Sequence, residues 1–121
     1  MDMNVKDIIK QIKIENENER QRIKDRIVKA FEEIEILKKD FLKIDNAMEK
    51  MIIFGSLAED RIETIEFDID IAVKSDKYYQ LVGRALESEF KVDVVDLDTI
   101  HKRIKKDIIE NGRVIYEKNK N

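Results

Sequence analysis

The chain contains no cysteine, no proline and a single histidine among its 121 residues. Without cysteine it forms neither disulfides nor zinc–cysteine sites, and thiolate catalysis is excluded, which fits a reducing compartment. The one histidine, His101, lies in the charged segment HKRIKK, and no Ser-His-Asp triad or histidine metal cluster can be assembled around it. The chemistry of the chain must therefore come from other side chains.

Long hydrophobic runs are also missing. No apolar stretch approaches the roughly 20 residues that a helix needs to cross a bilayer. The N-terminal segment MDMNVKDIIK lacks the apolar centre of a signal peptide. We therefore expect a cytoplasmic protein with no membrane partner.

An excess of one sign of charge is absent as well. Charged residues make up 42% of the chain, both signs are interspersed, and the formal net charge is only -3. A nucleic-acid-binding domain is normally basic over a whole face, so this composition argues against a nucleic-acid partner. The length suits one domain with its own core.

The first 47 residues have the apolar periodicity of a helix. One stripe recurs at steps of three and four, formed by Ile23, Ile27, Phe31, Ile34, Leu37, Phe41 and Ile44. A shorter stripe precedes it, formed by Val5, Ile8, Ile9 and Ile12. The polar segment ENENERQR between the two stripes is either a break or an exposed turn of a continuous helix. We assign residues 1–48 to an N-terminal helical extension and residues 49–121 to a second domain.

The long stripe has two interpretations. A helix over residues 22–45 would be about 36 Å long, which exceeds what so small a domain needs to cover its sheet. The stripe therefore either packs on its own domain or forms an interface. The interface would be with a partner protein or with a second copy of the chain, giving a homo-oligomer through the N-terminal helices.

From residue 51 onward, short apolar runs alternate with helical segments, which predicts an α+β fold with a small mixed β-sheet flanked by helices. The expected strands are MIIF, FDIDIAVK, KVDVVDL and RVIYEK. KVDVVDL is apolar on both faces and is therefore expected at the centre of the sheet. SDKYYQLVGRALESEF is expected to be a helix with Leu86 and Phe90 turned inward. A last helix should begin at an Asp98 or Thr99 cap and end near Gly112.

Two aspartates flank one isoleucine in the strand FDIDIAVK. Successive side chains in a strand point to opposite faces, so Asp68 and Asp70 share a face. Like charges this close repel, and either a cation or open solvent offsets the repulsion. In KVDVVDL, alternation sends Asp93 and Asp96 to opposite faces, so only one of them can join the pair. If Asp93 joins, the three carboxylates suit Mg²⁺ or Mn²⁺, because both ions prefer oxygen ligands.

A Gly-Ser pair lies where the first expected strand meets the next helix. Gly55 permits close approach of a ligand to the backbone, and the free amides of a helix start at Ser56 favour a phosphate. The alternative is purely structural, because Ser56 and Glu59 also have the spacing of a helix capping box. Both interpretations stay open at this point.

In this order, the segments FGSLAEDRIETIEFDIDIAV, KVDVVDL and ENGRVIYEK resemble the nucleotidyltransferases of the polymerase-beta type. Among these, the chain is most similar to the minimal nucleotidyltransferase (MNT) antitoxins that pair with HEPN toxins. The resemblance covers residues 50–118. It departs from the family at two positions, because members usually have a glycine where this chain has Asp60 and a serine where it has Phe67.

The resemblance implies a role for each motif. The turn at Gly55 and Ser56 would hold nucleotide phosphates. The paired Asp68 and Asp70 would bind the metal ions, and Asp93 would help to bind metal and activate the attacking hydroxyl.

The activity implied is a Mg²⁺-dependent (or Mn²⁺-dependent) transfer of a nucleoside monophosphate, AMP from the substrate ATP, to a hydroxyl. The acceptor would be a tyrosine of a HEPN toxin, which makes the chain an antitoxin that acts by AMPylation. Two alternatives stay open. The chain is either a catalytically idle MNT-like antitoxin that neutralises its partner by binding, or a nucleotidyltransferase that modifies a small molecule.

Overall fold

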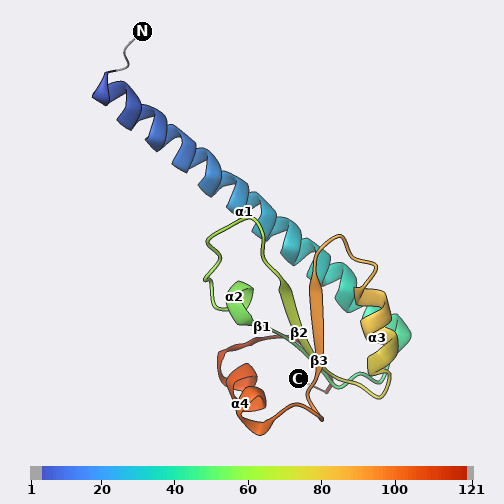
Figure 1. Cartoon of the computed structure of the whole chain (residues 1–121). Coiled ribbons are helices and arrows are strands. Elements are labelled where there is room, and N and C mark those ends of the chain that lie inside the picture. The colour runs from blue at the N-terminus through green and yellow to red at the C-terminus, as the bar shows by residue number, and fades with distance from the viewer. Residues whose placement is uncertain (1–3, 120–121) are drawn as a thin grey trace.

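One helix of 40 residues, α1 (Val5–Ile44), projects beyond a small sheet in the computed structural model (Figure 1). The structure describes residues 4–119; residues 1–3 and 120–121, at the outer ends of the two predicted domains, lie outside the described range. The helix continues through ENENERQR, so the predicted alternative of a break is wrong. Side-chain pairs across one turn support this polar stretch, including Arg22 with Glu19 at 2.7 Å and Gln21 with Asp25 at 2.9 Å.

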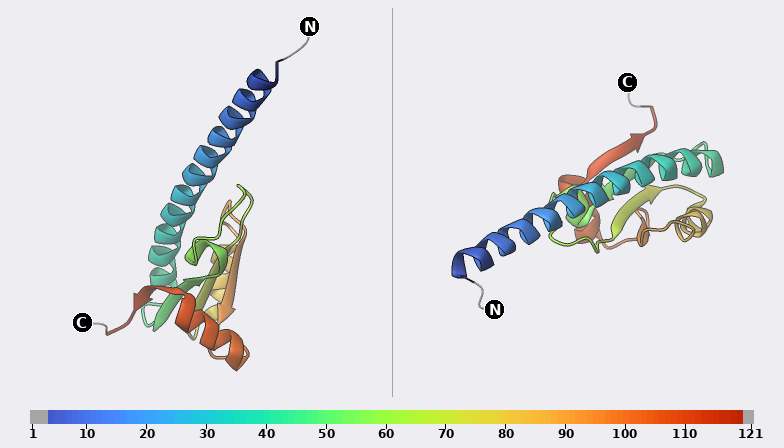
Figure 2. Two further views of the ribbon diagram at one scale, coloured as in Figure 1. Left: turned by 90° about the vertical axis from the view of Figure 1, so that its left-hand side faces the viewer. Right: turned by 90° about the horizontal axis from the view of Figure 1, so that it is seen from above.

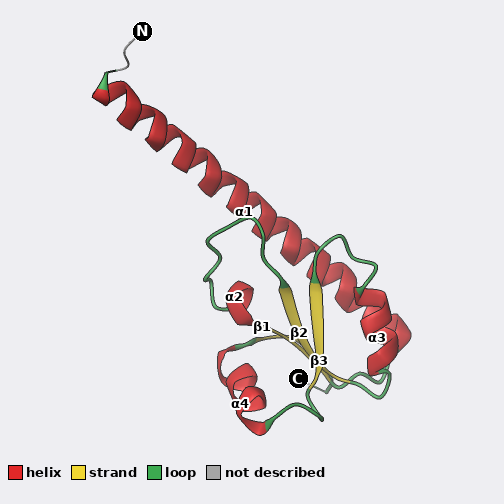
Figure 3. Cartoon of the chain, viewed as in Figure 1, coloured by secondary structure: helices red, strands yellow, loops and turns green. Residues whose placement is uncertain are grey.

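Four strands form one sheet, which Figure 3 shows in yellow. They are β1 (Lys50–Phe54), β2 (Ile69–Lys74), β3 (Val92–Asp96) and β4 (Arg113–Glu117). The order across the sheet is β3-β2-β1-β4. β1 pairs antiparallel with β2 and β4, whereas β2 and β3 are parallel. This mixed sheet confirms the predicted α+β fold class.

Helices cover both faces of the sheet (Figure 2). The C-terminal half of α1 and α3 (Tyr78–Ala85) pack on one face, and α4 (Lys102–Asn111) packs on the other. A single helical turn, α2 (Gly55–Ala58), follows β1. The smaller core cluster beneath α4 consists of Ile52, Ala72, Leu97 and Ile108. None of the helices within residues 4–119 is both long and apolar enough to cross a membrane.

The long stripe of α1 belongs to the core of its own domain. Its central residues, Ala30, Ile34, Leu37 and Phe41, are at most 2% exposed. Ile27, Phe31 and Ile44 are partly buried against the same core. The interpretation of this stripe as an interface is therefore wrong from Ile27 onward. The shorter stripe at Val5, Ile8, Ile9 and Ile12 is between 41% and 70% exposed.

The strand KVDVVDL lies at an edge of the sheet, and the prediction that it is central is wrong. The strand has valines on both of its faces because helices cover both faces of the sheet. Val94 packs against the large core cluster and Val95 against the cluster beneath α4. The Tyr78 hydroxyl also donates a hydrogen bond of 2.7 Å to the Val94 carbonyl. A strand that is apolar on both faces therefore indicates that both faces of the sheet are covered. It does not indicate whether the strand has one neighbouring strand or two.

The last two helices begin or end elsewhere than predicted. α4 begins after His101, whose Nδ1 accepts a 3.1 Å hydrogen bond from the Arg103 backbone N–H, so the predicted cap at Asp98 or Thr99 is wrong. A turn closed by the Asp96 carboxylate, which accepts from the Asp98 N–H at 2.9 Å, occupies that segment instead. α3 ends at Ala85, and Leu86 is therefore 77% exposed rather than turned inward.

Candidate functional site

Three aspartates lie on one face of the sheet. Asp68 immediately precedes β2, and Asp70 on β2 is the register partner of Asp93 on the parallel strand β3. Register partners on neighbouring strands point to the same face, and residues two apart on one strand do so as well. Asp96 is the register partner of Val73, which is buried in the core on the opposite face. The predicted separation of Asp93 from Asp96 is confirmed.

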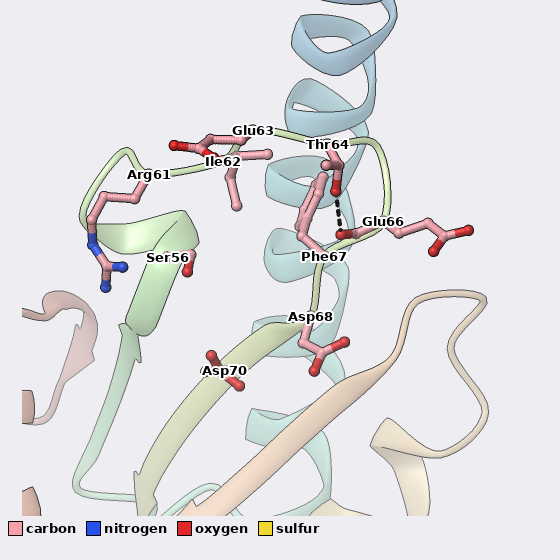
Figure 4. A pocket seen from close by; sticks show the side chains of 9 residues that line it. All are labelled: Ser56, Arg61, Ile62, Glu63, Thr64, Glu66, Phe67, Asp68 and Asp70. Carbon is pink, nitrogen blue, oxygen red and sulfur yellow. Dashed lines mark hydrogen bonds between the residues drawn. The ribbon is translucent and has the colours of Figure 1, made fainter.

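The aspartate pair lines a cleft of about 380 Å³ (Figure 4). The cleft lies under the irregular segment between α2 and β2, and its lining residues are Ser56, Arg61, Ile62, Glu63, Thr64, Glu66, Phe67, Asp68 and Asp70. Four of these residues carry a carboxylate and one carries a guanidinium. The guanidinium of Arg61 lies 3.2 Å from the Glu59 carboxylate. The cleft is therefore strongly negative, and a polyanion entering it needs accompanying cations.

Two of the acidic residues of this cleft, Glu63 and Glu66, were not predicted from the sequence. They lie in a segment without helix or strand, where no periodicity indicates the direction of a side chain. The signal available in the sequence was the high density of acids in EDRIETIE. That density alone does not separate a cleft from a solvated loop.

Gly55 is required by the packing of the site. Its φ of +75° lies in the left-handed region, which favours glycine. A Cβ atom at this position would also overlap the carboxylate of Asp70. Gly55 thus lets the start of α2 approach Asp70 closely.

Ser56 lines the cleft from the first turn of α2, as Figure 4 shows. No side chain caps this helix, and its N-cap residue is Phe54. The predicted capping box between Ser56 and Glu59 is therefore not formed. The Ser56 hydroxyl remains on the cleft wall, where it can donate a hydrogen bond to a ligand.

The pKa of the Asp70 carboxyl is raised above its usual value of 3.8. Burial is the largest cause, because it removes water from the charged form, and the negative charges of Asp93 and Asp68 add to it. The Lys91 ammonium acts in the opposite direction and lowers the pKa. The site thus disfavours its own charged carboxylate, a tension that a bound cation would relieve.

Asp93 is exposed at the edge of the sheet. Its position therefore does not carry the burial cost that an acid in a covered central strand would have. Exposure leaves the Asp93 carboxylate accessible to a second molecule.

The three carboxylates fit Mg²⁺ through the chemistry of their donors, which are all oxygen atoms. Within residues 4–119, no three acidic or histidine side chains already converge on one point as a closed cage. Mg²⁺ does not require such a cage, because it is commonly bound by one or two carboxylates together with substrate phosphates and water. The fold brings Asp68, Asp70 and Asp93 to one face of the sheet.

The structure explains both departures from the family pattern. Asp60 stands where a glycine is usual, and its φ of +56° is left-handed, a conformation that aspartate tolerates better than most residues. Phe67 stands where a serine is usual, and its ring packs against Phe90 with 6.3 Å between centroids. The Arg26 guanidinium of α1 covers Phe90 at 3.8 Å from the ring centroid. Phe67 thereby ties the chain just before Asp68 to α1.

Comparison with known proteins places the chain in a family. Residues 34–121 match the family described as Polymerase beta, Nucleotidyltransferase. This match covers most of the chain, and the chain therefore belongs to the polymerase beta nucleotidyltransferase family. The predicted resemblance is confirmed at this level. No curated protein sequence matches the chain.

Solved structures share this fold. A toxin–antitoxin crystallised with AMP-PNP is 22% identical, with a TM-score of 0.56 over 70% of this chain and 74% of that chain. A mutant of the toxin–antitoxin MntA-HpeT is 22% identical, with a TM-score of 0.51 over 72% and 73% of the two chains. A protein from Shewanella oneidensis is 20% identical, with a TM-score of 0.51 over 69% and 70%. These likenesses establish the fold of the site.

Proposed function

We propose that the chain is an MNT-type antitoxin that transfers AMP from ATP to a tyrosine hydroxyl of a HEPN toxin. One observation carries the proposal. Asp68, Asp70 and Asp93 share a sheet face, beside the Gly55–Ser56 turn and an acidic cleft, in a fold of the nucleotidyltransferase family. The likeness to toxin–antitoxin structures supports the antitoxin role.

The nucleotide would enter the cleft with its phosphates toward the turn after β1. The Ser56 hydroxyl lies on the cleft wall, and Gly55 holds the start of α2 against the Asp70 carboxylate. Arg61, whose backbone N–H donates a 2.9 Å hydrogen bond to the Ser56 carbonyl, can exchange its contact with Glu59 for a phosphate oxygen. The remaining carboxylates of the lining repel a triphosphate, so binding requires a divalent ion.

Asp68 and Asp70 would hold this ion, Mg²⁺ or Mn²⁺, with Asp93 beside them. A bound ion would neutralise phosphate charge and lower the pKa of the acceptor hydroxyl. The aspartates are suited to this role because the strand ladder fixes their backbones. Positioning and charge neutralisation supply most of the catalysis in such transfers.

Asp93 would act as the general base. The acceptor oxygen attacks the α-phosphorus of ATP, the bond from that phosphorus to the pyrophosphate oxygen breaks, and the hydroxyl proton passes to the Asp93 carboxylate. The products are the AMP ester of the acceptor and pyrophosphate. Because Asp93 is exposed at the sheet edge, a hydroxyl on a folded protein can reach it.

The exposure of Asp93 favours a protein acceptor over a small molecule. A dedicated small-molecule enzyme would enclose its second substrate, whereas Asp93 lies outside the residues that line the cleft. The alternative of an idle antitoxin that acts by binding alone uses the same fold, but it gives the acidic cleft no role. We therefore favour the enzymatic function.

Calorimetry with ATP and Mg²⁺ tests the nucleotide site. We expect ATP binding that requires Mg²⁺ and that falls at least about tenfold when Asp68→Asn and Asp70→Asn are combined, because the ion then loses its carboxylates. Asp96→Asn, on the opposite face, serves as the control and should bind as the wild type does. Equal affinity in the double variant and the wild type would rule out the metal assignment.

A further inference from the structure

Lys91 lies beside the acidic face without being part of the cleft lining. It immediately precedes β3, and its backbone carbonyl accepts a 2.9 Å hydrogen bond from the Ile69 N–H. This bond extends the parallel ladder of β2 and β3 by one position toward Asp68. The Lys91 ammonium Nζ lies 3.5 Å from Oδ2 of Asp68.

Other cations near the site are held elsewhere. The Arg61 guanidinium contacts Glu59 at 3.2 Å. Lys74, at the far end of the same face of β2, lies 3.3 Å from Glu49. Lys91, by contrast, pairs with Asp68 and lowers the pKa of Asp70.

The ion pair of Lys91 is easily broken. The side chain of Lys91 is 72% exposed and that of Asp68 is 42% exposed. An exposed pair of this kind contributes little to stability, because water screens both charges and the long side chain loses rotational freedom. Lys91 can therefore leave Asp68 at small cost when a stronger cation arrives.

We propose that Lys91 is a tethered counter-ion, which occupies the cation position at Asp68 in the metal-free protein and is displaced when a divalent ion binds. This inference rests on the proposed function, since it concerns the same carboxylates. The inference adds that Lys91 competes with the divalent ion for Asp68 and thereby lowers the metal affinity of the site. Metal loading is then an exchange of one cation for another.

The test is a titration with Mn²⁺ alone, without nucleotide, followed by the paramagnetic signal of free Mn²⁺. We expect Lys91→Met to lower the Kd for Mn²⁺ about threefold or more, because the competing charge is gone. Lys74→Met is the matched control, since it removes an equally charged, paired lysine from the same sheet face roughly 13 Å from Asp70. Lys91→Arg should restore the affinity of the wild type.

A second measurement is a thermal melt without metal and with saturating Mn²⁺. In a chelator, Lys91→Met should melt below the wild type, because the carboxylates lose their counter-ion, and saturating Mn²⁺ should remove the difference. If the wild type binds Mn²⁺ and Lys91→Met binds it with unchanged or weaker affinity, the inference is overturned and the proposed function stays intact. Absence of Mn²⁺ binding in every variant, with or without ATP, would overturn both.

Discussion

Asp70 has the least favourable surroundings for its own charge among the three aspartates of the site. It is half-buried, it has Asp68 and Asp93 as neighbours, and its carboxylate packs against Gly55. Surroundings that disfavour a residue's own charge are common where a ligand completes a site. At the residue scale, Lys91 offsets the burial and repulsion at Asp70 only in part.

Asp70→Asn should raise the melting temperature in a chelator at neutral pH. The pKa of the Asp70 carboxyl in the folded state lies above 3.8. The contribution of this carboxyl to stability is therefore fully present below pH 3.8 and is lost as the pH rises through its folded-state pKa. At neutral pH the charged form therefore destabilises the fold, and asparagine removes that charge. Thermal melts at neutral pH and below pH 3.8 measure the effect, which should vanish in acid. A lower melting temperature at neutral pH would contradict this account.

Gly55→Ala should weaken ATP binding at least about tenfold, because the new methyl group displaces the Asp70 carboxylate and the backbone is held at a left-handed φ. Gly83→Ala is the matched control. A Cβ at Gly83 in α3 would meet no atom within 4 Å, so this variant should be more stable by about 0.5–1 kcal/mol and bind ATP normally. Calorimetry and urea unfolding measure the two effects. Normal ATP binding by Gly55→Ala would argue against the close packing of the turn on Asp70.

At the scale of elements, α1 is one helix with two environments. Ile12 and Ile34 are separated by 34 − 12 = 22 residues, about six turns, so they lie on the same face of the helix. Ile34 is 2% exposed in the core, whereas Ile12 is 50% exposed beyond the sheet. The face that packs on the sheet thus continues past the domain without a cover. An apolar helix face of this kind suits a partner protein.

Ile8→Glu combined with Ile12→Glu should abolish binding of the proposed HEPN toxin partner, because charges replace two of the four apolar side chains of the exposed stripe. The fold itself should keep its stability within about 0.5 kcal/mol, since neither side chain reaches the core. Ile34→Ala, in the buried part of the same face, should instead cost about 2–5 kcal/mol.

Co-purification with the toxin and urea unfolding measure these two outcomes for α1. Full retention of the toxin by the doubly charged variant would leave the exposed stripe without a role in binding. A large loss of stability in that variant would show that the stripe is covered within its own chain.

The alternation of side chains along a strand made part of the aspartate site predictable from the sequence. The side-chain period of two depends on the strand alone, and it placed Asp68 and Asp70 on one face and Asp93 and Asp96 on opposite faces. The family resemblance, and not alternation, selected Asp93 as the third acid. The edge position of β3 was beyond this reasoning, because sheet neighbours depend on the path of the whole chain. The cap of α4 at His101 was missed because several polar residues competed for that role.

At the scale of the whole molecule, the projecting part of α1 begins beside the cleft. Ile65 of the cleft segment lies together with Arg22 and Arg26 of α1 around a shallow surface depression. Residues 12 and 25 of α1 are 13 residues apart, which is about 20 Å along the helix. A partner bound to the exposed stripe would therefore have to extend at least about 20 Å along α1 to present a hydroxyl at Asp93. Figure 1 shows this arrangement of α1, the cleft segment and β3.

Transfer of labelled AMP from ATP to the HEPN toxin, compared between Asp93→Asn and Asp96→Asn, tests the central claim most directly. Both variants remove one carboxylate from β3, but only Asp93 shares a face with Asp68 and Asp70. The account predicts that Asp93→Asn lowers the transfer rate about a hundredfold or more, the usual size of a general-base effect, and that Asp96→Asn stays within a few-fold of the wild type. Equal rates in the two variants, or a loss confined to Asp96→Asn, would contradict it.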